Sequence, residues 1–187
     1  MKRVHGFQLV VLAALLGVVT SAHASLLRAM SLVQLVSGSD RIVVGKVVAV
    51  TAAWDARHLK IISTIELEIA EDWKGPDTGS RRVTIVQPGG SVGEIEMTVH
   101  GMPSFALGET SLLFLRGQRF FQVVGMGQGK RVVTWDDAGK RWLAHGPDAD
   151  GVVDIEPDAK LSPVKPSKPI PLTDLRAQVM RAIGKSP

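Results

Sequence analysis

The alternation of apolar and polar side chains is the feature that most constrains the fold of this chain. It is clearest where Ile65, Leu67 and Ile69 alternate with polar residues, because neighbouring side chains of a strand point to opposite faces of a sheet. The same period of two recurs through residues 42–144, between short segments rich in glycine and proline. The pattern predicts a mainly β domain, a small antiparallel β-barrel, with helices only at its ends.

Turn residues and breaks in the alternation divide this region into individual strands. Gly45 lies inside the first strand, where a glycine predicts a bulge or a sharp bend. Asp136-Asp137-Ala138-Gly139 predicts a hairpin turn, and residues 53–58 and 125–129 are expected to be irregular connections. The expected strands cover residues 42–50, 64–69, 82–87, 94–99, 112–115, 120–124, 131–135 and 140–144.

Helical patterns occur only before and after the β region. A largely apolar segment at 26–36 predicts a short buried helix, and a stripe of apolar residues at 174–183 predicts a second helix, with Thr173 as its N-cap and Gly184 as its end. Five prolines between the β region and this helix predict an extended linker. We therefore expect a barrel domain at 25–156, a proline-rich linker at 157–171, and a C-terminal helix and tail at 172–187.

The N-terminus has the three parts of a secretory signal peptide. Lys2 and Arg3 precede an apolar run at residues 7–19, and Ala22-His23-Ala24 is the small-x-small pattern that precedes cleavage, here before Ser25. The alternative is an uncleaved N-terminal anchor. The sequence predicts an exported protein, periplasmic or extracellular, with a signal peptide at 1–24 and no membrane span in the mature chain.

Composition excludes several classes of chemistry. The chain has no cysteine, so disulfides, thiol catalysis and cysteine-ligated zinc are excluded. Loss of Lys2 and Arg3 lowers the formal charge from +4 to +2, and the remaining positive charge is concentrated at the C-terminal end. A slightly acidic body with a basic tail lacks the clustered cations that bind a phosphate backbone, so no nucleic acid partner is expected. A scaffold role that uses the basic tail is an open alternative.

The order of the segments is similar to that of a known group of modules. Val43-Val44-Gly45-Lys46-Val47 opens the β region, Asp72-Trp73-Lys74-Gly75 and Pro88-Gly89-Gly90 follow, and Phe105-Ala106-Leu107-Gly108-Glu109 precedes a buried strand. Over residues 31–133 this layout resembles the OB-like barrel of netrin and tissue-inhibitor-of-metalloprotease modules, and small exported bacterial proteins of unassigned role.

The resemblance implies an OB-like barrel that binds a partner protein, which for such inhibitors is a protease. Those inhibitors chelate the catalytic zinc through an N-terminal cysteine, whereas the predicted mature terminus here is Ser25. That route of inhibition is therefore not carried over, and the resemblance leaves the partner unnamed.

Gly89-Gly90-Ser91-Val92-Gly93 matches the G-x-S-x-G pattern of serine hydrolases. The pattern requires a helix after the serine, and alternating residues follow it here, so a glycine-rich hairpin is the preferred interpretation. The hydrolase alternative would use Ser91 with Asp136 or Asp137 and His145.

Signals for metals and phosphates are weak. The acidic segment Asp148 to Glu156 resembles a calcium loop that lacks one ligand, and a polar loop is preferred. His58, His100 and His145 have no metal-ligand spacing. Gly125 to Lys130 does not fit the P-loop spacing. No cofactor and no metal are expected.

Tryptophans and loop residues remain as candidates for binding. Trp135 and Trp142 lie on the two arms of one predicted hairpin, where they either cover the core or form an exposed contact site. We expect a non-enzymatic binding or inhibitory module for an exported or envelope protein, with the serine hydrolase and the envelope scaffold as alternatives. The expected binding residues are Trp54, Pro88, Gly89, Gly90, Ser91, Met102, Pro103, Phe105, Trp135 and Trp142.

Overall fold

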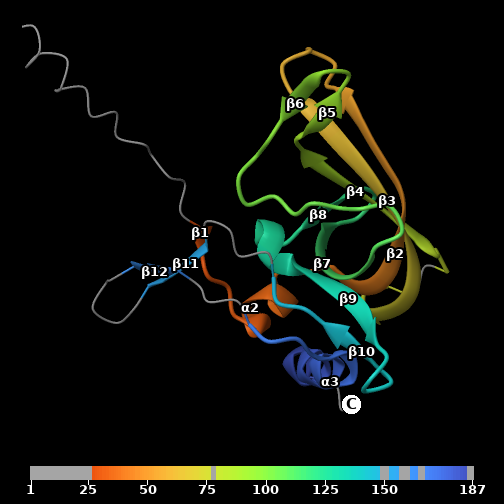
Figure 1. Cartoon of the computed structure of the whole chain (residues 1–187), viewed down its shortest axis with the longest axis vertical. Helices are drawn as coiled ribbons and strands as arrows, with labels where there is room; N and C mark the ends of the chain where they lie inside the picture. The colour runs from red at the N-terminus through yellow and green to blue at the C-terminus, as the bar shows by residue number, and fades with distance from the viewer. Residues whose placement is uncertain (1–26, 77–78, 148–151, 156–160, 164–166, 185–187) are drawn as a thin grey trace, which may run out of the picture.

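A computed structural model describes residues 27–76, 79–147, 152–155, 161–163 and 167–184. The predicted signal peptide lies outside these residues, as do Asp148 and Asp150 of the calcium-loop alternative. Figure 1 shows a β structure with the β5–β6 hairpin at one end and helix α3 at the other.

The described elements agree with a mainly β chain that has helices near its ends. The strands of the main sheet are β2 (Arg41–Trp54), β3 (Ile61–Lys74), β4 (Arg82–Pro88), β7 (Thr110–Gly117), β8 (Phe121–Val123), β9 (Lys130–Asp136), β10 (Arg141–Ala144) and β13 (Ile170–Pro171). The remaining elements are β1 (Leu27–Arg28), α2 (Leu32–Ser37), β5 (Gly90–Val92), β6 (Ile95–Met97), the 3₁₀ helix η1 (Met126–Gly129), β11 (Val152–Ile155), β12 (Leu161–Pro163) and α3 (Leu172–Ile183).

The main sheet closes on itself as a barrel. Its strands follow the order β13-β10-β9-β7-β2-β3-β4-β8, and a second pairing joins β7 to β8. The strands β7, β2, β3, β4 and β8 therefore form a closed five-stranded barrel. The ladders are antiparallel except for one parallel contact between Ile85 and Phe121. The predicted fold class is confirmed, and this barrel is compatible with an OB-like one.

Strands β2 and β3 are long enough to extend beyond the barrel as a two-stranded ribbon. Each has fourteen residues, but β7 pairs only with Arg41 to Lys46 of β2. Register shifts occur between Val44 and Gly45 and again before Ala49, which confirms the predicted irregularity. A Cβ at Gly45 would lie 2.4 Å from the carbonyl oxygen of Glu68, so glycine permits this close approach.

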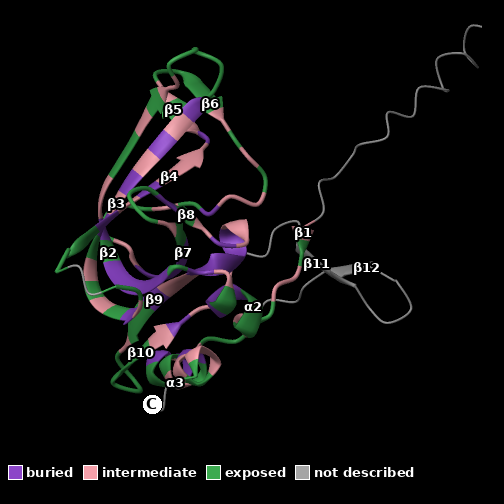
Figure 2. Cartoon of the chain, turned by 180° about the vertical axis from the view of Figure 1, so that it is seen from behind, coloured by how far each residue is buried: buried purple, intermediate pink, exposed green. Residues whose placement is uncertain are grey.

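Two apolar clusters pack against opposite faces of the barrel wall. The inner cluster includes Val43, Leu67, Ile85 and Leu113, and the outer cluster lies between the sheet and the two helices. Consequently, the part of β2 inside the barrel is buried on both faces, whereas its far half is largely exposed (Figure 2). The outer cluster consists of Leu35, Val36, Ile42, Val44, Trp73, Leu112, Phe114, Val124, Val133, Ala144, Leu172, Leu175 and Val179.

The first helix is shorter than the sequence predicts. It begins at Leu32, after a capping box in which Ser31 and Gln34 exchange side-chain and backbone hydrogen bonds. Ser31 is the N-cap, and an N-cap residue immediately precedes the first helical residue. The expected start at residue 26 is wrong, since Leu27 and Arg28 pair in parallel with β11 instead.

The C-terminal helix packs onto the barrel through the outer cluster. It begins at Leu172 after Pro171, so the prediction of Thr173 as N-cap is wrong: its hydroxyl donates to Asp174 inside the first turn. Its predicted end at Gly184 is confirmed, with the left-handed conformation (φ 77°) that glycine adopts without strain.

Two expected connections contain regular structure. Ala53 and Trp54 belong to β2, because Asp55 and Lys60 close a tight turn directly after them. Residues 126–129 form a 3₁₀ helix, whose buried Gln128 binds the backbone of Arg28 and Met30. The predicted hairpin turn at residues 136–139 is confirmed by the β9–β10 pairing.

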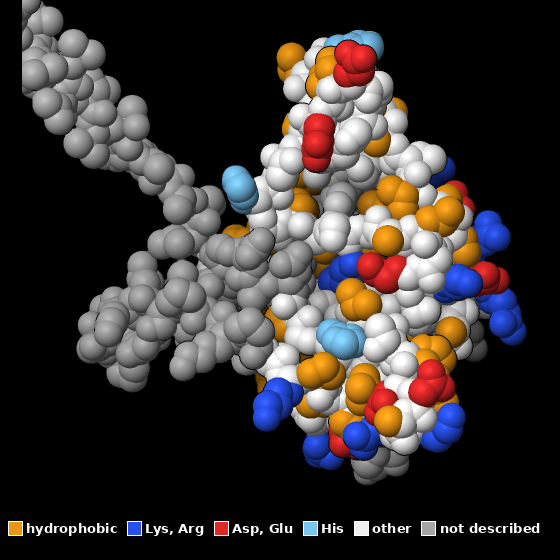
Figure 3. Space-filling model, viewed as in Figure 1, with side chains coloured by type: hydrophobic (Ala, Val, Ile, Leu, Met, Phe, Trp, Pro, Cys, Tyr) orange, Lys and Arg blue, Asp and Glu red, His pale blue; other side chains and the backbone are white. Residues whose placement is uncertain are grey.

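Charge is unevenly distributed on the face seen in Figure 3. Most of the visible Lys and Arg side chains lie on the middle and lower parts, with acidic side chains and a histidine among them, whereas the charged side chains near the β5–β6 hairpin are mainly acidic. Among the described helices, none combines the length and the apolar character needed to cross a membrane.

Candidate functional site

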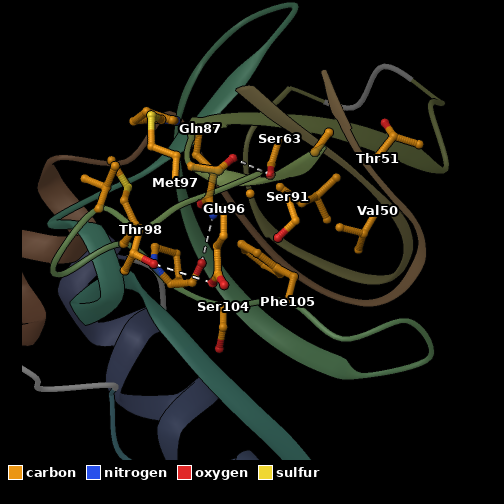
Figure 4. A pocket seen from close by; sticks show the side chains of 18 residues that line it. Val50, Thr51, Ser63, Gln87, Ser91, Glu96, Met97, Thr98, Ser104 and Phe105 are labelled. Atoms are coloured by element: carbon orange, nitrogen blue, oxygen red, sulfur yellow. Dashed lines mark hydrogen bonds between the residues drawn. The ribbon is translucent and has the colours of Figure 1, made fainter. Parts of the chain in front are cut away.

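A trough of about 520 Å³ lies beside the part of the β2–β3 ribbon that extends beyond the barrel. The ribbon forms one wall, and the β5–β6 hairpin and the loop that follows it form the others (Figure 4). We define the trough by its lining: residues 50–52 of β2, Ser63 and Ile65 of β3, and residues 87–91, 96–99 and 102–105.

The structure brings most of the predicted binding residues together in this trough. They come from the end of β4, from the β5–β6 hairpin and from the loop before β7. Three predicted residues lie elsewhere, as described below. The predicted residues that line the trough are Pro88, Gly89, Gly90, Ser91, Met102, Pro103 and Phe105.

Glycine positions the β5–β6 hairpin against the ribbon. Gly90 has φ 123°, and a Cβ there would lie 2.4 Å from the hydroxyl oxygen of Ser63 and 3.0 Å from the Cβ of Ala52. The Ser63 hydroxyl donates to the carbonyl oxygen of Gly89 (2.7 Å). The close approach that only glycine allows therefore lets the hairpin cross the ribbon and enclose one end of the trough.

The loop before β7 is held as the opposite wall of the trough. The Gln87 side-chain amide donates to the carbonyl oxygen of Pro103 (2.9 Å). One residue further, the carbonyl oxygen of Ser104 accepts a hydrogen bond from the Lys130 ammonium. Phe105 then packs against the inner cluster of the barrel. These contacts fasten the loop to β4 and β9.

An ion pair between Lys130 and Glu109 holds Lys130 in place against this loop. Lys130 Nζ lies 2.7 Å from Glu109 Oε1, and the Ser111 hydroxyl donates to the same carboxylate oxygen at 2.6 Å. The Lys130 side chain is only 6% exposed, and its ammonium lies 4.7 Å from the centre of the Phe105 ring. Charge-assisted bonds at low dielectric are strong only when every member is satisfied, so this network holds the loop in one position.

The lining of the trough combines apolar and polar side chains in similar share. Met97, Met102 and Phe105 supply apolar surface, and methionine adapts readily to different ligand shapes. Glu96 is the only charged residue of the lining. Its carboxylate accepts a long hydrogen bond from Thr98 (3.5 Å) and makes no ion pair within the described residues.

One buried acceptor of the lining has no partner. The side-chain oxygen of Gln87 is buried, and no described group donates to it. An unsatisfied buried acceptor costs about 1–3 kcal/mol. The trough wall therefore contains a polar atom whose hydrogen-bonding capacity is unused.

Trp54 lies at the end of the ribbon and outside the trough lining. It pairs with Ile61 across the ladder, and its ring lies 6.3 Å from that of His58 in the turn. Trp54 is therefore close in sequence to the trough wall at residues 50–52 but is not part of the lining itself.

Trp135 and Trp142 lie near helix α3, remote from the trough along the molecule (Figure 1). They face each other across the β9–β10 ladder, edge to face, with ring centres 5.3 Å apart. They are 45% and 46% exposed, so neither is a core residue. With Glu71, Trp73 and others they line a separate hollow of about 280 Å³.

The serine of the hydrolase pattern is not brought to its expected partners. Ser91 is exposed on strand β5 of the β5–β6 hairpin, and not in a loop between strands as the glycine-rich sequence predicts. His145 hydrogen-bonds Thr134 (2.7 Å), and Asp136 and Asp137 contact residues of the β9–β10 hairpin. Within the described residues, Ser91 makes no hydrogen bond with any of these groups.

The described part of the chain contains no cluster of three or more His, Asp or Glu residues that could hold a metal ion. His58 lies in the turn after β2, and His100 is an exposed residue of the loop after β6. The Gly125 to Lys130 segment forms η1 and the start of β9.

Sequence reasoning missed the ribbon as a trough wall. From the sequence, residues 50–52 and Ser63 look like ordinary strand residues, and Gln87 looks like the end of a strand, so none of them was predicted to line a binding site. The available signal was the length of the apolar, β-rich run before the Ala53 to His58 segment, which exceeds what a small barrel uses. Glu96 belongs to a strand that was predicted, but its unpaired charge became evident only in three dimensions.

A scan of family models, a search of curated proteins and a search of solved structures found no match for this chain.

Proposed function

We propose that this chain is an exported, non-enzymatic binding module that holds a segment of a partner protein in the trough. The main observation behind this proposal is that two segments separated in sequence, at residues 87–91 and 102–105, line the same hollow. Ligand sites are typically concave and mostly apolar, with a few placed polar groups. The trough is concave in the same way and has apolar surface from Met97, Met102 and Phe105, but a similar share of its lining is polar.

The rigidity of the surrounding wall supports binding in a preformed site. The loop before β7 is tied to β4 and to the buried Lys130–Glu109 pair. A wall that is already ordered loses little conformational entropy when a ligand binds. Export is proposed from the predicted signal peptide at 1–24, and an inhibitory role would follow if the bound segment belongs to a protease.

Capture of partners by the full chain, purified from the exported fraction, tests this function. Ser91 is exposed on the trough lining, so Ser91→Trp fills the trough without disturbing the core. Trp142→Ala is the matched control, since it alters an exposed residue remote from the trough. Crosslinking followed by quantitative mass spectrometry should identify proteins retained by the native chain and the control and lost with Ser91→Trp.

Two results would contradict the proposal. One is a set of captured proteins that Ser91→Trp leaves unchanged, and the other is capture that requires Trp142. A proteolysis assay with the captured partner distinguishes the inhibitory form of the proposal from simple binding: an inhibitor slows cleavage in proportion to occupancy, and Ser91→Trp abolishes that effect.

A further inference from the structure

The ribbon wall of the trough has an unpaired strand edge. The chain that pairs with β2 on this side runs only as far as Val47, whose N–H donates to Glu109 and whose carbonyl accepts from Gly108. At Gly108 (φ 83°) the chain turns away, and the loop before it is anchored at Ser104 and Gln87 as described. No strand among the described residues pairs with this edge of β2 beyond Val47.

The register of the ladder identifies which residues direct their N–H and C=O groups toward β3. At the tip, the N–H of Asp55 donates to the carbonyl oxygen of Lys60 (2.9 Å). Hydrogen-bonded and non-hydrogen-bonded pairs alternate along an antiparallel ladder. Ala53 and Thr51 are therefore the hydrogen-bonded residues that face β3.

It follows that Val50, Ala52 and Trp54 direct their N–H and C=O groups away from β3. The partner of Trp54 confirms this alternation, because the carbonyl oxygen of Ile61 faces β4 and accepts from the N–H of Gly89 (2.9 Å). An edge with regularly spaced, unpaired donors and acceptors is a template for another strand.

The trough meets this edge directly. Residues 50, 51 and 52 all line it, although neighbouring side chains of a strand point to opposite faces. Consecutive lining residues therefore mean that the hollow borders the edge of β2 as well as one face. Val50 itself is 42% exposed, as expected for a residue beside an unpaired strand edge.

We propose that the trough takes an extended segment of the partner protein as an added β-strand along the Val50–Trp54 edge of β2. This inference rests on the proposed function of the trough. Main-chain hydrogen bonds to Val50, Ala52 and Trp54 provide affinity, and alternate side chains of the bound segment enter the trough, which provides specificity. Met97, Met102 and Phe105 contact those side chains.

Charge determines the kind of segment that fits. Glu96 carries the only charge on the lining and has no cationic partner among the described residues. Glu96 is exposed, and an exposed carboxylate attracts a nearby cation and repels an anion, with an effect that salt weakens. The bound strand accordingly carries a lysine or arginine among its trough-facing residues, flanked by β-branched residues, which suit a strand.

Two occupants other than a partner segment are outcomes that the experiments must distinguish. A second copy of this chain could pair through the same edge, and a basic segment of the chain itself could fold back onto it. Sedimentation of the purified full chain measures the first, because self-pairing gives a concentration-dependent dimer that Ala52→Pro dissolves. Either occupant would overturn the proposal.

Binding of synthetic peptides tests the strand directly. The probes are extended peptides of roughly six residues, a usual strand length, with alternating valine and threonine and with lysine, alanine or glutamate at one trough-facing position. We expect the lysine peptide to bind about tenfold more tightly than the glutamate peptide. Glu96→Gln should remove that preference, and Glu94→Gln, which changes a residue outside the lining, should keep it.

Backbone methylation of the lysine peptide provides the decisive measurement. In an added strand every second amide donates to β2, so N-methylation should weaken binding about tenfold or more at alternate positions and little between them. Uniform sensitivity, or none, would overturn strand addition while leaving the trough as a binding site.

A substitution in β2 provides the second measurement. Ala52→Pro removes an N–H that faces the trough and keeps the ladder with β3, whereas Thr51→Pro removes an N–H that bonds β3. We expect Ala52→Pro to fold and to release both the peptide and the captured partner. If the partner stays bound to folded Ala52→Pro, strand addition is wrong and the proposed function stands. If neither peptide nor partner binds the native chain, the proposed function itself fails.

Discussion

The two halves of strand β2 have different environments within one continuous strand. From Arg41 to Val47 nearly every residue is buried, since β3 and β7 pair on both edges and apolar clusters cover both faces. From Ala49 to Trp54 the strand pairs only with β3 among the described strands, although β5 crosses it at Ala52, and it becomes half-exposed. In the first half, the backbone hydrogen-bonding groups and the apolar side chains are all used within the fold. In the second half, one strand edge is unpaired and apolar surface is exposed. The trough lies beside this second half.

The buried ion pair at the junction of the two halves should give the largest effect. Lys130→Met leaves the Glu109 carboxylate without its counter-ion in a buried place, which typically costs about 3–5 kcal/mol. The free energy of unfolding, measured with urea, should fall by that amount. The double variant with Glu109→Gln should recover part of it, and a loss below about 1 kcal/mol would mean that the pair does not hold the loop.

Core truncation compares the two halves directly. Leu113→Ala removes a fully buried side chain of the inner cluster and should lower the free energy of unfolding by about 2–5 kcal/mol. Val50→Ala, in the open half, should change it by less than about 1 kcal/mol. If both variants lost the same free energy of unfolding in urea, the side chains of the ribbon would contribute to stability as much as those of the barrel core.

Glycine substitutions examine how the hairpin lies on the ribbon. Gly90→Ala combines a strained φ with a Cβ 2.4 Å from the Ser63 hydroxyl, so we expect a loss of roughly 2–4 kcal/mol. Gly93→Ala is the matched control, because it also has a positive φ (60°) but no atom within 4 Å, and should cost only about 1 kcal/mol. Thermal unfolding of both variants measures the difference.

The smallest effect is expected at the ribbon tip on acidification. The Asp55 carboxylate accepts the backbone N–H of Leu59 (2.8 Å) and of Lys60, and these bonds hold the pKa of Asp55 below its ordinary value of 3.8. The unfolded chain takes up the proton first as the pH falls, so the contribution of this turn is complete above about pH 4 and is lost as the pH falls through the lowered pKa.

Amide chemical shifts of Leu59 and Lys60 should follow the titration of Asp55, with a midpoint below 3.8. Asp55→Ala removes the titrating carboxyl and should abolish that transition, while the amides of the barrel remain unaffected. A midpoint at or above the ordinary value would show that these hydrogen bonds are not formed in solution.

Local pattern predicted both helices and most strands of the main sheet, but it missed β5 and η1 and gave the limits of several elements wrongly. The alternation at Ile65, Leu67 and Ile69 predicted β3, whereas the glycine-rich pattern around Gly89 predicted a hairpin loop where β5 forms. The start of helix α2 was missed because a run of apolar residues does not distinguish a buried helix from an extended segment. Thr173 was predicted as the N-cap, but the stripe of apolar residues is equally compatible with a helix that begins at Leu172, directly after Pro171.

The binding residues were predicted in part for a similar reason. Pro88 to Ser91 and Met102 to Phe105 are recognisable from sequence as loops, and loops carry function more often than strands do. Trp54, Trp135 and Trp142 were grouped with them because exposed aromatic residues favour binding, yet the fold places them outside the trough.

Residue order alone determined that this chain forms a small, cysteine-free antiparallel β-barrel with a helix after it, because side-chain alternation and turn residues act over a few neighbours. Only the tertiary structure decided where β7 leaves β2, which segments meet around the trough and that Glu96 of its lining has no cationic partner among the described residues. Those properties depend on contacts between residues distant in the chain, such as Gln87 with Pro103 and Lys130 with Glu109, and no local pattern contains them.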